Sequence, residues 1–314
     1  MFLRNLVGYS AANLVVQALQ FVQGMIVRSL LPPALMGVWN YVGVVVAGAA
    51  TFDLGIMAAA SRDLPLLHGA GRREEESTMR ATAFWSRLAQ SMVLGGGMMV
   101  WAAFAAAHGN RLAWPVAAAA ALLALLSACN ESLGTFCQSQ ERYVTLGMSN
   151  VFGAAASAVL LPLGAWLAGV RGLVVGAMLG LGLQLVQLVW RTRREGLTVA
   201  WTWRWPALRA LLGYGVPMRL VDYPLAVFMI LDVLVVTRLL EAGELAVYAT
   251  AKIMVAMAID IPSRMGNVYL SRLYVQCGAG ADRRELGDEL ARYLMAQYLV
   301  VMPLVICVVW WFAS

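Results

Sequence analysis

Long apolar segments separated by short polar ones run along the whole of this chain. Each segment is about as long as the 17–25 residues that cross a bilayer as a helix. The first segment is too long for a cleaved secretory signal and is interpreted as a retained span. Hardly any polar chain is left for a domain outside the membrane, so any activity must lie among the helices. The pattern predicts nine membrane-spanning helices, over residues 6–27, 35–60, 82–107, 113–136, 145–168, 172–190, 211–235, 245–270 and 289–312.

A short sequence near the start recurs about two-thirds of the way along the chain. Val7-Gly8-Tyr9-Ser10 returns as Leu212-Gly213-Tyr214-Gly215, and Ser61-Arg62 returns as Ser271-Arg272. The offset drifts only from 205 to 210 residues, which indicates a duplication with small changes in the loops. Six predicted spans separate the two copies, so both begin on the same side of the membrane. Parallel repeats of this kind are typical of secondary transporters, whose substrate site lies between the copies.

The repeat divides the chain into a complete first copy and a shorter second one. We expect a first six-helix lobe over 1–190, a cytoplasmic linker over 191–210, and the first three helices of a second lobe over 211–314. The linker contains three tryptophans that alternate with polar residues, and tryptophan anchors a segment at the level of the lipid headgroups. The predicted fold class is therefore an all-α, polytopic membrane bundle of about nine helices, with two parallel lobes and an incomplete second lobe.

Composition supports the membrane assignment and excludes a nucleic-acid partner. The chain is 61% hydrophobic with a mean hydropathy of +0.73, and only 13% of its residues are charged, against about 25% in soluble domains. The net charge of +6 comes from arginines on one side of the membrane. With a cytoplasmic N-terminus, 16 arginines fall on the cytoplasmic side and four on the other, as the positive-inside rule requires. The four cysteines have no metal or redox spacing.

Ionisable residues within the spans are the first candidates for function, because each costs about 2.5–3.5 kcal/mol on insertion scales. Arg219 and Asp222 are three residues apart in the seventh span, share a helix face and could pair. Pro217 and Pro224 flank them and free backbone carbonyls, as in helices that line cavities. A structural ion pair that locks this helix to a neighbour is the alternative interpretation.

Three further acidic residues are candidates for ion or proton coupling or for structural pairing. Asp53 and Asp260 each lie near a helix end, where Arg62 and Arg264 could pair with them across a turn. Glu131 follows Asn130 in an otherwise apolar helix and has no cation near it in the sequence. It is therefore the better candidate for handling a proton or a cation.

Uncharged amides form a stripe along the first span. Asn13, Gln17 and Gln20 fall within about 60° of one another around the helix. Amides on one face of a membrane helix either hydrogen-bond a neighbouring helix or line a wet cavity. With the cations Arg87, Arg219 and Lys252 they would suit an anionic cargo such as a phosphate-linked sugar, since cations match its charge and amides its hydroxyls.

The sequence carries no set of residues for bond-making chemistry. No Ser/His/Asp set, metal cluster or catalytic carboxylate pair can be placed, and no nucleotide-binding motif is found. We therefore predict a binding and transport protein, not an enzyme, without a metal or a cofactor. Whether a proton or sodium gradient drives the transport stays open.

Several short motifs resemble one family of membrane proteins. They are Arg-x-Leu-Leu-Pro-Pro-x-x-x-Gly-Val-Trp (28–39), Phe-Asp-Leu-Gly-Ile (52–56), Ser-Arg-Asp-Leu-Pro (61–65), Leu-Leu-Gly-Tyr-Gly-Val-Pro (211–217), and Asp232 ahead of Val-Tyr-Ala-Thr-Ala-Lys (247–252). Loosely, and over the whole chain, they resemble the polysaccharide-transporter branch of the multidrug/oligosaccharidyl-lipid/polysaccharide flippase superfamily, which includes O-antigen and capsule flippases.

The resemblance implies a location, a cargo and an architecture. Members have two six-helix lobes around a central cleft in the bacterial inner membrane. They move undecaprenyl-pyrophosphate-linked oligosaccharides to the periplasmic leaflet, with basic cleft residues on the pyrophosphate. Members have 12 to 14 spans, so we expect this chain to be incomplete or to depend on a further polypeptide.

Two other functions stay open at this point. One is a cation-coupled multidrug exporter of the same superfamily. The other is a membrane scaffold that holds glycosyltransferases or a polysaccharide polymerase at the cytoplasmic face. The expected partners are a lipid-linked oligosaccharide and membrane lipids, with the polymerase or glycosyltransferases as further candidates.

Overall fold

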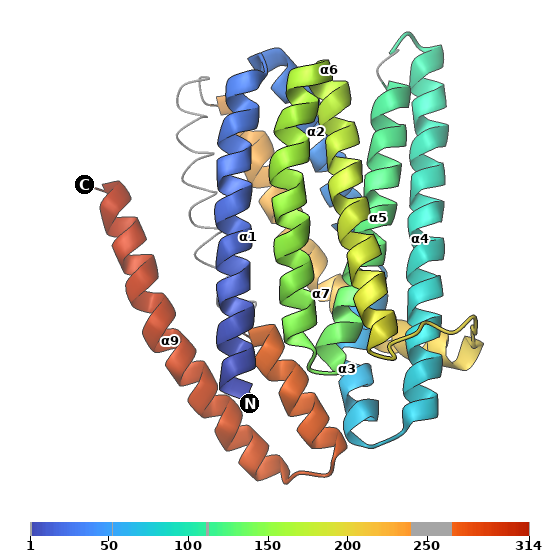
Figure 1. The fold of residues 1–314 in the computed structure, drawn as a ribbon, viewed down its shortest axis with the longest axis vertical. Coiled ribbons are helices and arrows are strands. Elements are labelled where there is room, and N and C mark those ends of the chain that lie inside the picture. Colours follow the sequence, from blue (N-terminus) through green and yellow to red (C-terminus); the bar gives the residue numbers. More distant parts are fainter. Residues whose placement is uncertain (1, 52, 111–112, 240–265, 314) are drawn as a thin grey trace.

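The computed structural model describes residues 2–51, 53–110, 113–239 and 266–313, and these residues form helices joined by short connections (Figure 1). This confirms the predicted all-α class. In chain order the described helices are α1 (Phe2–Leu30), α2 (Pro33–Thr51), α3 (Ile56–Gly69), α4 (Arg73–Ala107), α5 (Ala113–Ser139), α6 (Tyr143–Arg194), α7 (Trp205–Leu239), a helix over 266–278, and α9 (Arg283–Ala313).

Four helices of the described part are long and apolar enough to cross a membrane: Gly8–Leu30, Arg73–Ala107, Ala113–Ser139 and Tyr143–Arg194. The last is two antiparallel helices, because Ala168 and Gly169 leave helical geometry and reverse the chain. The turn lies between the predicted spans 145–168 and 172–190. The two arms of α6 pack closely through three glycines spaced four residues apart, Gly172, Gly176 and Gly180. Small residues allow such close packing between membrane helices.

The predicted single span over 35–60 is wrong. Helix α2 ends at Thr51, the chain from Asp53 to Gly55 is not helical, and α3 continues to Gly69. Gly55 has φ 74°, a left-handed conformation that glycine adopts without steric cost. We call residues 53–55 the break.

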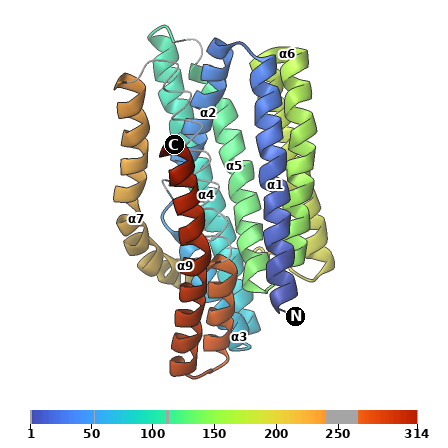
Figure 2. The same cartoon turned by 90° about the vertical axis from the view of Figure 1, so that its left-hand side faces the viewer.

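The bundle divides into a first group of helices and α7, which stands apart from α1 and α6. Helix α1 packs along α6, α4 along α5, and α5 also contacts α6, while α7 packs against α3 and α4. Figure 2 shows α7 at one edge of the molecule and α1 with α6 at the opposite edge.

The crossing of α3 with the helix over 266–278 is symmetric. A Cβ on Gly69 would meet the carbonyl oxygen of Val275, and a Cβ on Gly278 would meet that of Leu66. Gly278 follows Gly69 by 209 residues, and Val275 follows Leu66 by the same number. The contact therefore relates equivalent positions of the two copies of the repeat. This is the geometry expected of two parallel lobes related by a pseudo-two-fold axis; the predicted lobe boundaries themselves stay a prediction.

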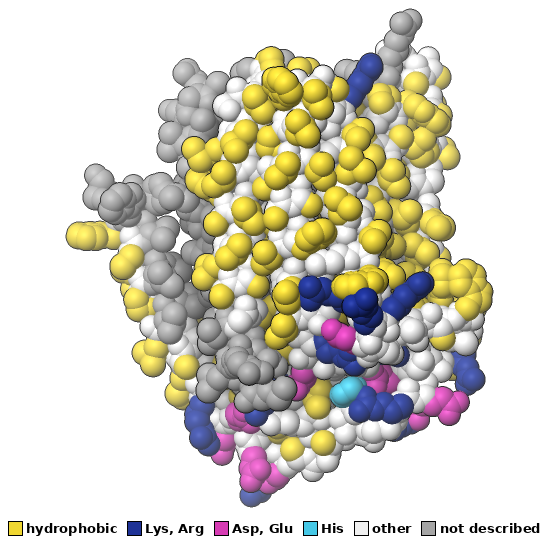
Figure 3. All heavy atoms as spheres, in the orientation of Figure 1, with side chains coloured by type: hydrophobic (Ala, Val, Ile, Leu, Met, Phe, Trp, Pro, Cys, Tyr) yellow, Lys and Arg dark blue, Asp and Glu magenta, His cyan; other side chains and the backbone are white. Residues whose placement is uncertain are grey.

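Charged side chains gather at the end of the molecule that carries the N-terminus, and hydrophobic side chains cover most of the remainder of the face in Figure 3. We call this the charged end. Buried Glu76 of α4 links this helix to α3 and to the turn after α5. Its carboxylate accepts from Gln140 (2.7 Å), contacts His68 (3.1 Å) and pairs with Arg73 (3.2 Å) and Arg80 (3.5 Å).

The segment between α6 and α7 is tied to α4 at the same end. The indole of Trp85 donates to the carbonyl of Ala200 (3.1 Å), and the indole of Trp203 donates to the hydroxyl of Ser86 (3.0 Å). Trp201 packs edge-on against Trp85 and is 85% exposed. The tryptophans of the linker thus combine a structural role with an exposed aromatic surface.

Candidate functional site: a charged seam and a cavity between the lobes

One face of α7 lies against the break. Gly215, Arg219 and Tyr223 are spaced four residues apart, so they point the same way from the helix. The backbone of Gly215 contacts that of Gly55. The guanidinium of Arg219 donates to Oδ2 of Asp53 (3.2 Å), and the hydroxyl of Tyr223 donates to the carbonyl of Asp53 (3.2 Å). Tyr223 thereby satisfies a backbone carbonyl that the break leaves outside a helix.

The contact between Asp53 and Arg219 belongs to a chain of five charged side chains from four parts of the fold. Arg87 of α4 lies 3.1 Å from the Glu131 carboxylate of α5 and 3.6 Å from Oδ1 of Asp53. Arg219 of α7 lies 3.7 Å from Asp222, one turn further along its own helix. The order is therefore Glu131, Arg87, Asp53, Arg219, Asp222. We call this chain the charged seam.

Burial falls from the centre of the charged seam to its ends. Asp53 is fully buried and Arg87 is 5% exposed, whereas Arg219 is 28% exposed and the two terminal carboxylates are about half exposed. Burying a carboxylate is tolerable only when it is paired, and the break places Asp53 where guanidinium groups from both lobes reach it. The pairing of Arg219 with Asp222 matches the sequence prediction.

The structure gives two acidic residues other surroundings than the sequence led us to expect. Asp53 does not pair with Arg62, which lies next to Asp63 at 2.6 Å instead. Glu131 does have a cation, Arg87, which lies 44 residues away in sequence. Neither contact could be read from local spacing, because both depend on how the helices pack.

The seam as a whole is slightly acidic. Its three carboxylates and two guanidiniums leave one negative charge, so Arg87 and Arg219 are already neutralised by protein groups. An anion that binds either arginine must compete with a carboxylate. The cation Lys252 and the carboxylate Asp260, both predicted for this region, lie outside the described residues.

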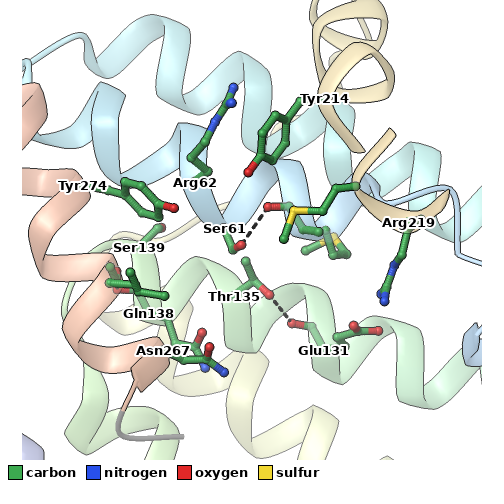
Figure 4. A pocket seen from close by; sticks show the side chains of 15 residues that line it. Ser61, Arg62, Glu131, Thr135, Gln138, Ser139, Tyr214, Arg219, Asn267 and Tyr274 are labelled. Atoms are coloured by element: carbon green, nitrogen blue, oxygen red, sulfur yellow. Dashed lines mark hydrogen bonds between the residues drawn. The ribbon is translucent and has the colours of Figure 1, made fainter. Parts of the chain in front are cut away.

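A cavity of about 310 Å³ lies between α3, α5, α7 and the helix over 266–278. Figure 4 shows Arg62, Tyr214 and Tyr274 along one side, Gln138 and Asn267 along another, and Arg219 with Glu131 together at one end. The guanidinium of Arg62 stacks on the ring of Tyr214 at 3.6 Å.

The chemistry of this cavity suits a hydroxyl-rich ligand. Hydroxyls of Ser61 and Thr135 and amides of Gln138 and Asn267 line it, and they can both donate and accept hydrogen bonds. The ring of Tyr214 adds a flat surface beside them. Arg219 joins the cavity to the seam, so a ligand with a sugar-like part and an anionic part would find partners for both.

The amides of the first span lie elsewhere. Asn13 and Gln20 line a second cavity, of about 430 Å³, between α1 and the two arms of α6, where Asn150 and Gln184 also face it. Gln184 donates to Asn150 at 3.1 Å, and Asn13 donates to the carbonyl of Tyr9 at 2.9 Å. The described cavities therefore separate these amides from the arginines, which the sequence had led us to expect in one cleft.

Gln17 does not line this second cavity, although it belongs to the same predicted stripe. The sequence analysis also did not single out Tyr214 and Tyr223 as site residues. Tyr223 follows Arg219 by four residues and shares its helix face, which could have identified it. Tyr214 precedes Arg219 by five residues and lies on another face of the helix, so that spacing did not indicate its place in the cavity. Substrate binding by Asn13, Gln17, Gln20 and the cations stays a prediction.

A family model described as "Polysaccharide biosynthesis protein" matches residues 70–313. No curated protein matches the chain. Among solved structures, a mutant of a Vibrio cholerae MATE transporter is 15% identical with a TM-score of 0.76, over 100% of this chain and 73% of that one. A MOP superfamily transporter from Pyrococcus furiosus is 15% identical with a TM-score of 0.73, over 98% of this chain and 69% of that one. These likenesses show that the chain has the MOP transporter fold.

Proposed function

Because this chain belongs to the polysaccharide biosynthesis protein family, we propose that it translocates an undecaprenyl-pyrophosphate-linked oligosaccharide across the bacterial inner membrane for surface polysaccharide assembly. The observation that carries the proposal is the cavity of about 310 Å³ with Arg219 at its end. Its hydroxyls, amides and aromatic ring fit the sugars, and Arg219 fits the diphosphate.

The position of the cavity supports transport. It lies between α3 and α5 of the first lobe and α7 and the helix over 266–278 of the second, and parallel-repeat transporters hold their substrates between the repeats. Rocking one lobe against the other about this site would expose the cavity to each side of the membrane in turn. The charged end would face the cytoplasm, where lipid-linked glycans are made and where glycosyltransferases and a polymerase would be the partners.

A specific observation favours a second candidate, a cation-coupled exporter of cationic drugs. The seam has one more carboxylate than guanidiniums, and Glu131 is about half exposed beside the cavity. A cationic cargo could approach the exposed side of Glu131, although Arg87 already pairs with this carboxylate at 3.1 Å. Efflux of a cationic dye from cells that express the protein would favour this function over glycan transport.

Complementation tests the proposal. In a strain whose surface glycan depends on this protein, we expect Arg219→Ala to abolish that glycan while membrane expression is retained. Arg209→Ala is the matched control, since Arg209 lies on the same helix with an exposed side chain and should support native glycan levels. Normal glycan with Arg219→Ala would reduce Arg219 to a structural pair and contradict the proposal.

A further inference from the structure

Asp53 holds Arg219 in a contact that joins the two lobes. Asp53 belongs to the first lobe and Arg219 to the second, and 3.2 Å separates the carboxylate oxygen from the guanidinium. A carboxylate and a phosphate bind the same face of a guanidinium, often through two parallel hydrogen bonds. Asp53 therefore takes up Nη2 of Arg219, a donor that an anionic ligand held by two parallel hydrogen bonds would use.

Arg219 is accessible to such a ligand, whereas Asp53 is not. Arg219 lines the cavity and is 28% exposed, and Asp53 is fully buried behind it. A phosphate that enters the cavity can approach the guanidinium from the open side. Asp53 is anchored by the break, so it can keep Arg219 only while the lobes stay together at this point.

Arg87 makes an exchange feasible. When Arg219 leaves, Asp53 would be a buried carboxylate without a partner, which is strongly unfavourable. Arg87 belongs to the same lobe, is 5% exposed and lies 3.6 Å from Oδ1 of Asp53. It stays with Asp53 in either arrangement, so the first lobe keeps a compensated charge.

We infer that Asp53 is an internal competitor for the anionic group of the cargo: a diphosphate that binds Arg219 displaces Asp53 and thereby releases the contact between the lobes. This inference rests on the proposed function and adds a role for a residue that does not itself touch the cargo. It makes release of the lobes dependent on cargo charge, because a neutral glycan cannot replace a carboxylate on a guanidinium.

The exchange can be followed with a cysteine at Ser271. Ser271 is 5% exposed and its hydroxyl donates to the carbonyl of Gln138 across the lobe contact (2.9 Å). Ser271 lines the cavity but is nearly buried. With the four native cysteines replaced by alanine, Ser271→Cys should therefore react slowly with a maleimide until the lobes separate. Farnesyl diphosphate is the probe, and farnesol is the matched probe without phosphate.

We expect farnesyl diphosphate, but not farnesol, to speed labelling several-fold. Asp53→Asn should speed labelling without any probe and tighten farnesyl diphosphate binding by about tenfold, since the competing state is removed. Asp222 also lies near Arg219, but it is half exposed and belongs to the same lobe as Arg219. Asp222→Asn should therefore have a smaller effect on the labelling rate and on farnesyl diphosphate binding. Weaker or unchanged binding by Asp53→Asn would overturn the inference.

Failure of the inference and failure of the proposed function give different results. If neither the native chain nor Asp53→Asn binds farnesyl diphosphate, the anionic cargo itself is wrong. If both bind it equally, the cargo stands and the competition is wrong. If Asp53→Asn does not yield folded protein, Arg219→Gln decides: labelling at the native rate, or a retained response to farnesyl diphosphate, would overturn the inference.

Discussion

Gly55 and Gly215 lie backbone against backbone: a Cβ built on Gly215 would collide with the carbonyl oxygen of Gly55. This contact brings α7 of the second lobe onto the break of the first. It sets the distance at which Arg219 and Tyr223, one and two turns further along α7, reach Asp53.

Gly215→Ala should therefore separate the lobes. The added methyl group meets backbone, which cannot rotate away, and overpacking of this kind costs about 1–3 kcal/mol. We expect a lower melting temperature in detergent and faster labelling of a cysteine at position 271. Gly213→Ala is the control: a Cβ there meets no atom within 4 Å, so it should melt like the native protein. Equal melting of the two variants would show that the contact is not tight.

Arg87 should be important for stability as well as for the seam. Arg87→Met removes the cation that lies near both Asp53 and Glu131, and breaking a buried pair costs about 3–5 kcal/mol. Arg72→Met is the comparison, because Arg72 and Glu75 form a 2.6 Å pair in which both side chains are more than half exposed, a kind worth at most about 1 kcal/mol. Thermal unfolding of both variants checks the difference, and similar losses would refute it.

Glu195, at the C-terminal end of α6, should make stability depend on pH. It accepts hydrogen bonds from Thr145 (2.6 Å) and Arg142 (2.7 Å). Partial burial acts to raise its pKa, but these bonds and the charge of Arg142 prevail and hold the pKa of Glu195 below its ordinary value of 4.5.

A carboxylate with a depressed pKa contributes stability that is present above its unfolded pKa and is lost as the pH falls through its folded pKa. We therefore expect Glu195→Gln to melt lower than the native protein at about pH 7, and the gap to shrink once the pH falls below 4.5. Melting curves at several pH values measure it. A gap that does not change with pH would show that the charge of Glu195 is not involved.

The bond from Trp85 should hold the linker on α4. Trp85→Phe keeps a ring beside Trp201 but leaves the carbonyl of Ala200 without its donor, at a cost of about 1 kcal/mol. We expect trypsin to cut the linker faster after Arg204. Trp101→Phe, on the same helix with 52% of the side chain exposed, should be cut at the native rate.

Sidedness follows from the distribution of arginines. A cysteine at Arg193 should react with an impermeant thiol reagent only from the cytoplasmic side, and one at Asn110 only from outside. Labelling of position 193 on intact spheroplasts would reverse the topology. Ala242, which the sequence also places outside, lies beyond the described residues.

The sequence predicted the helices well because an apolar run of sufficient length has few other stable forms in a bilayer. It missed the break at Asp53 because hydropathy averages over a window, and one acidic residue and one glycine hardly alter the average over 35–60. The repeat proved more informative: its matched pair Ser61-Arg62 and Ser271-Arg272 lies on the two helices that cross at Gly69 and Gly278.

The seam was only partly predictable for a similar reason. Arg219 and Asp222 could be paired from their spacing on one helix, and the structure has them 3.7 Å apart. Arg87 meets Glu131 and Asp53 only through the packing of α4 on its neighbours. The cost of burying each charge indicated that partners exist, without indicating which they are.

At three places in the described part of the chain the backbones of the two lobes pack so closely that a Cβ would not fit between them: Gly55 with Gly215, Gly69 with Val275, and Leu66 with Gly278. The shape of these backbone contacts depends on where glycines stand, whereas the contact of Asp53 with Arg219 depends on its side chains. Residues that face the cavity can therefore diverge to suit a new cargo while these backbone contacts keep their shape. Point mutations in the cavity can then change the cargo without altering the contacts about which one lobe moves against the other.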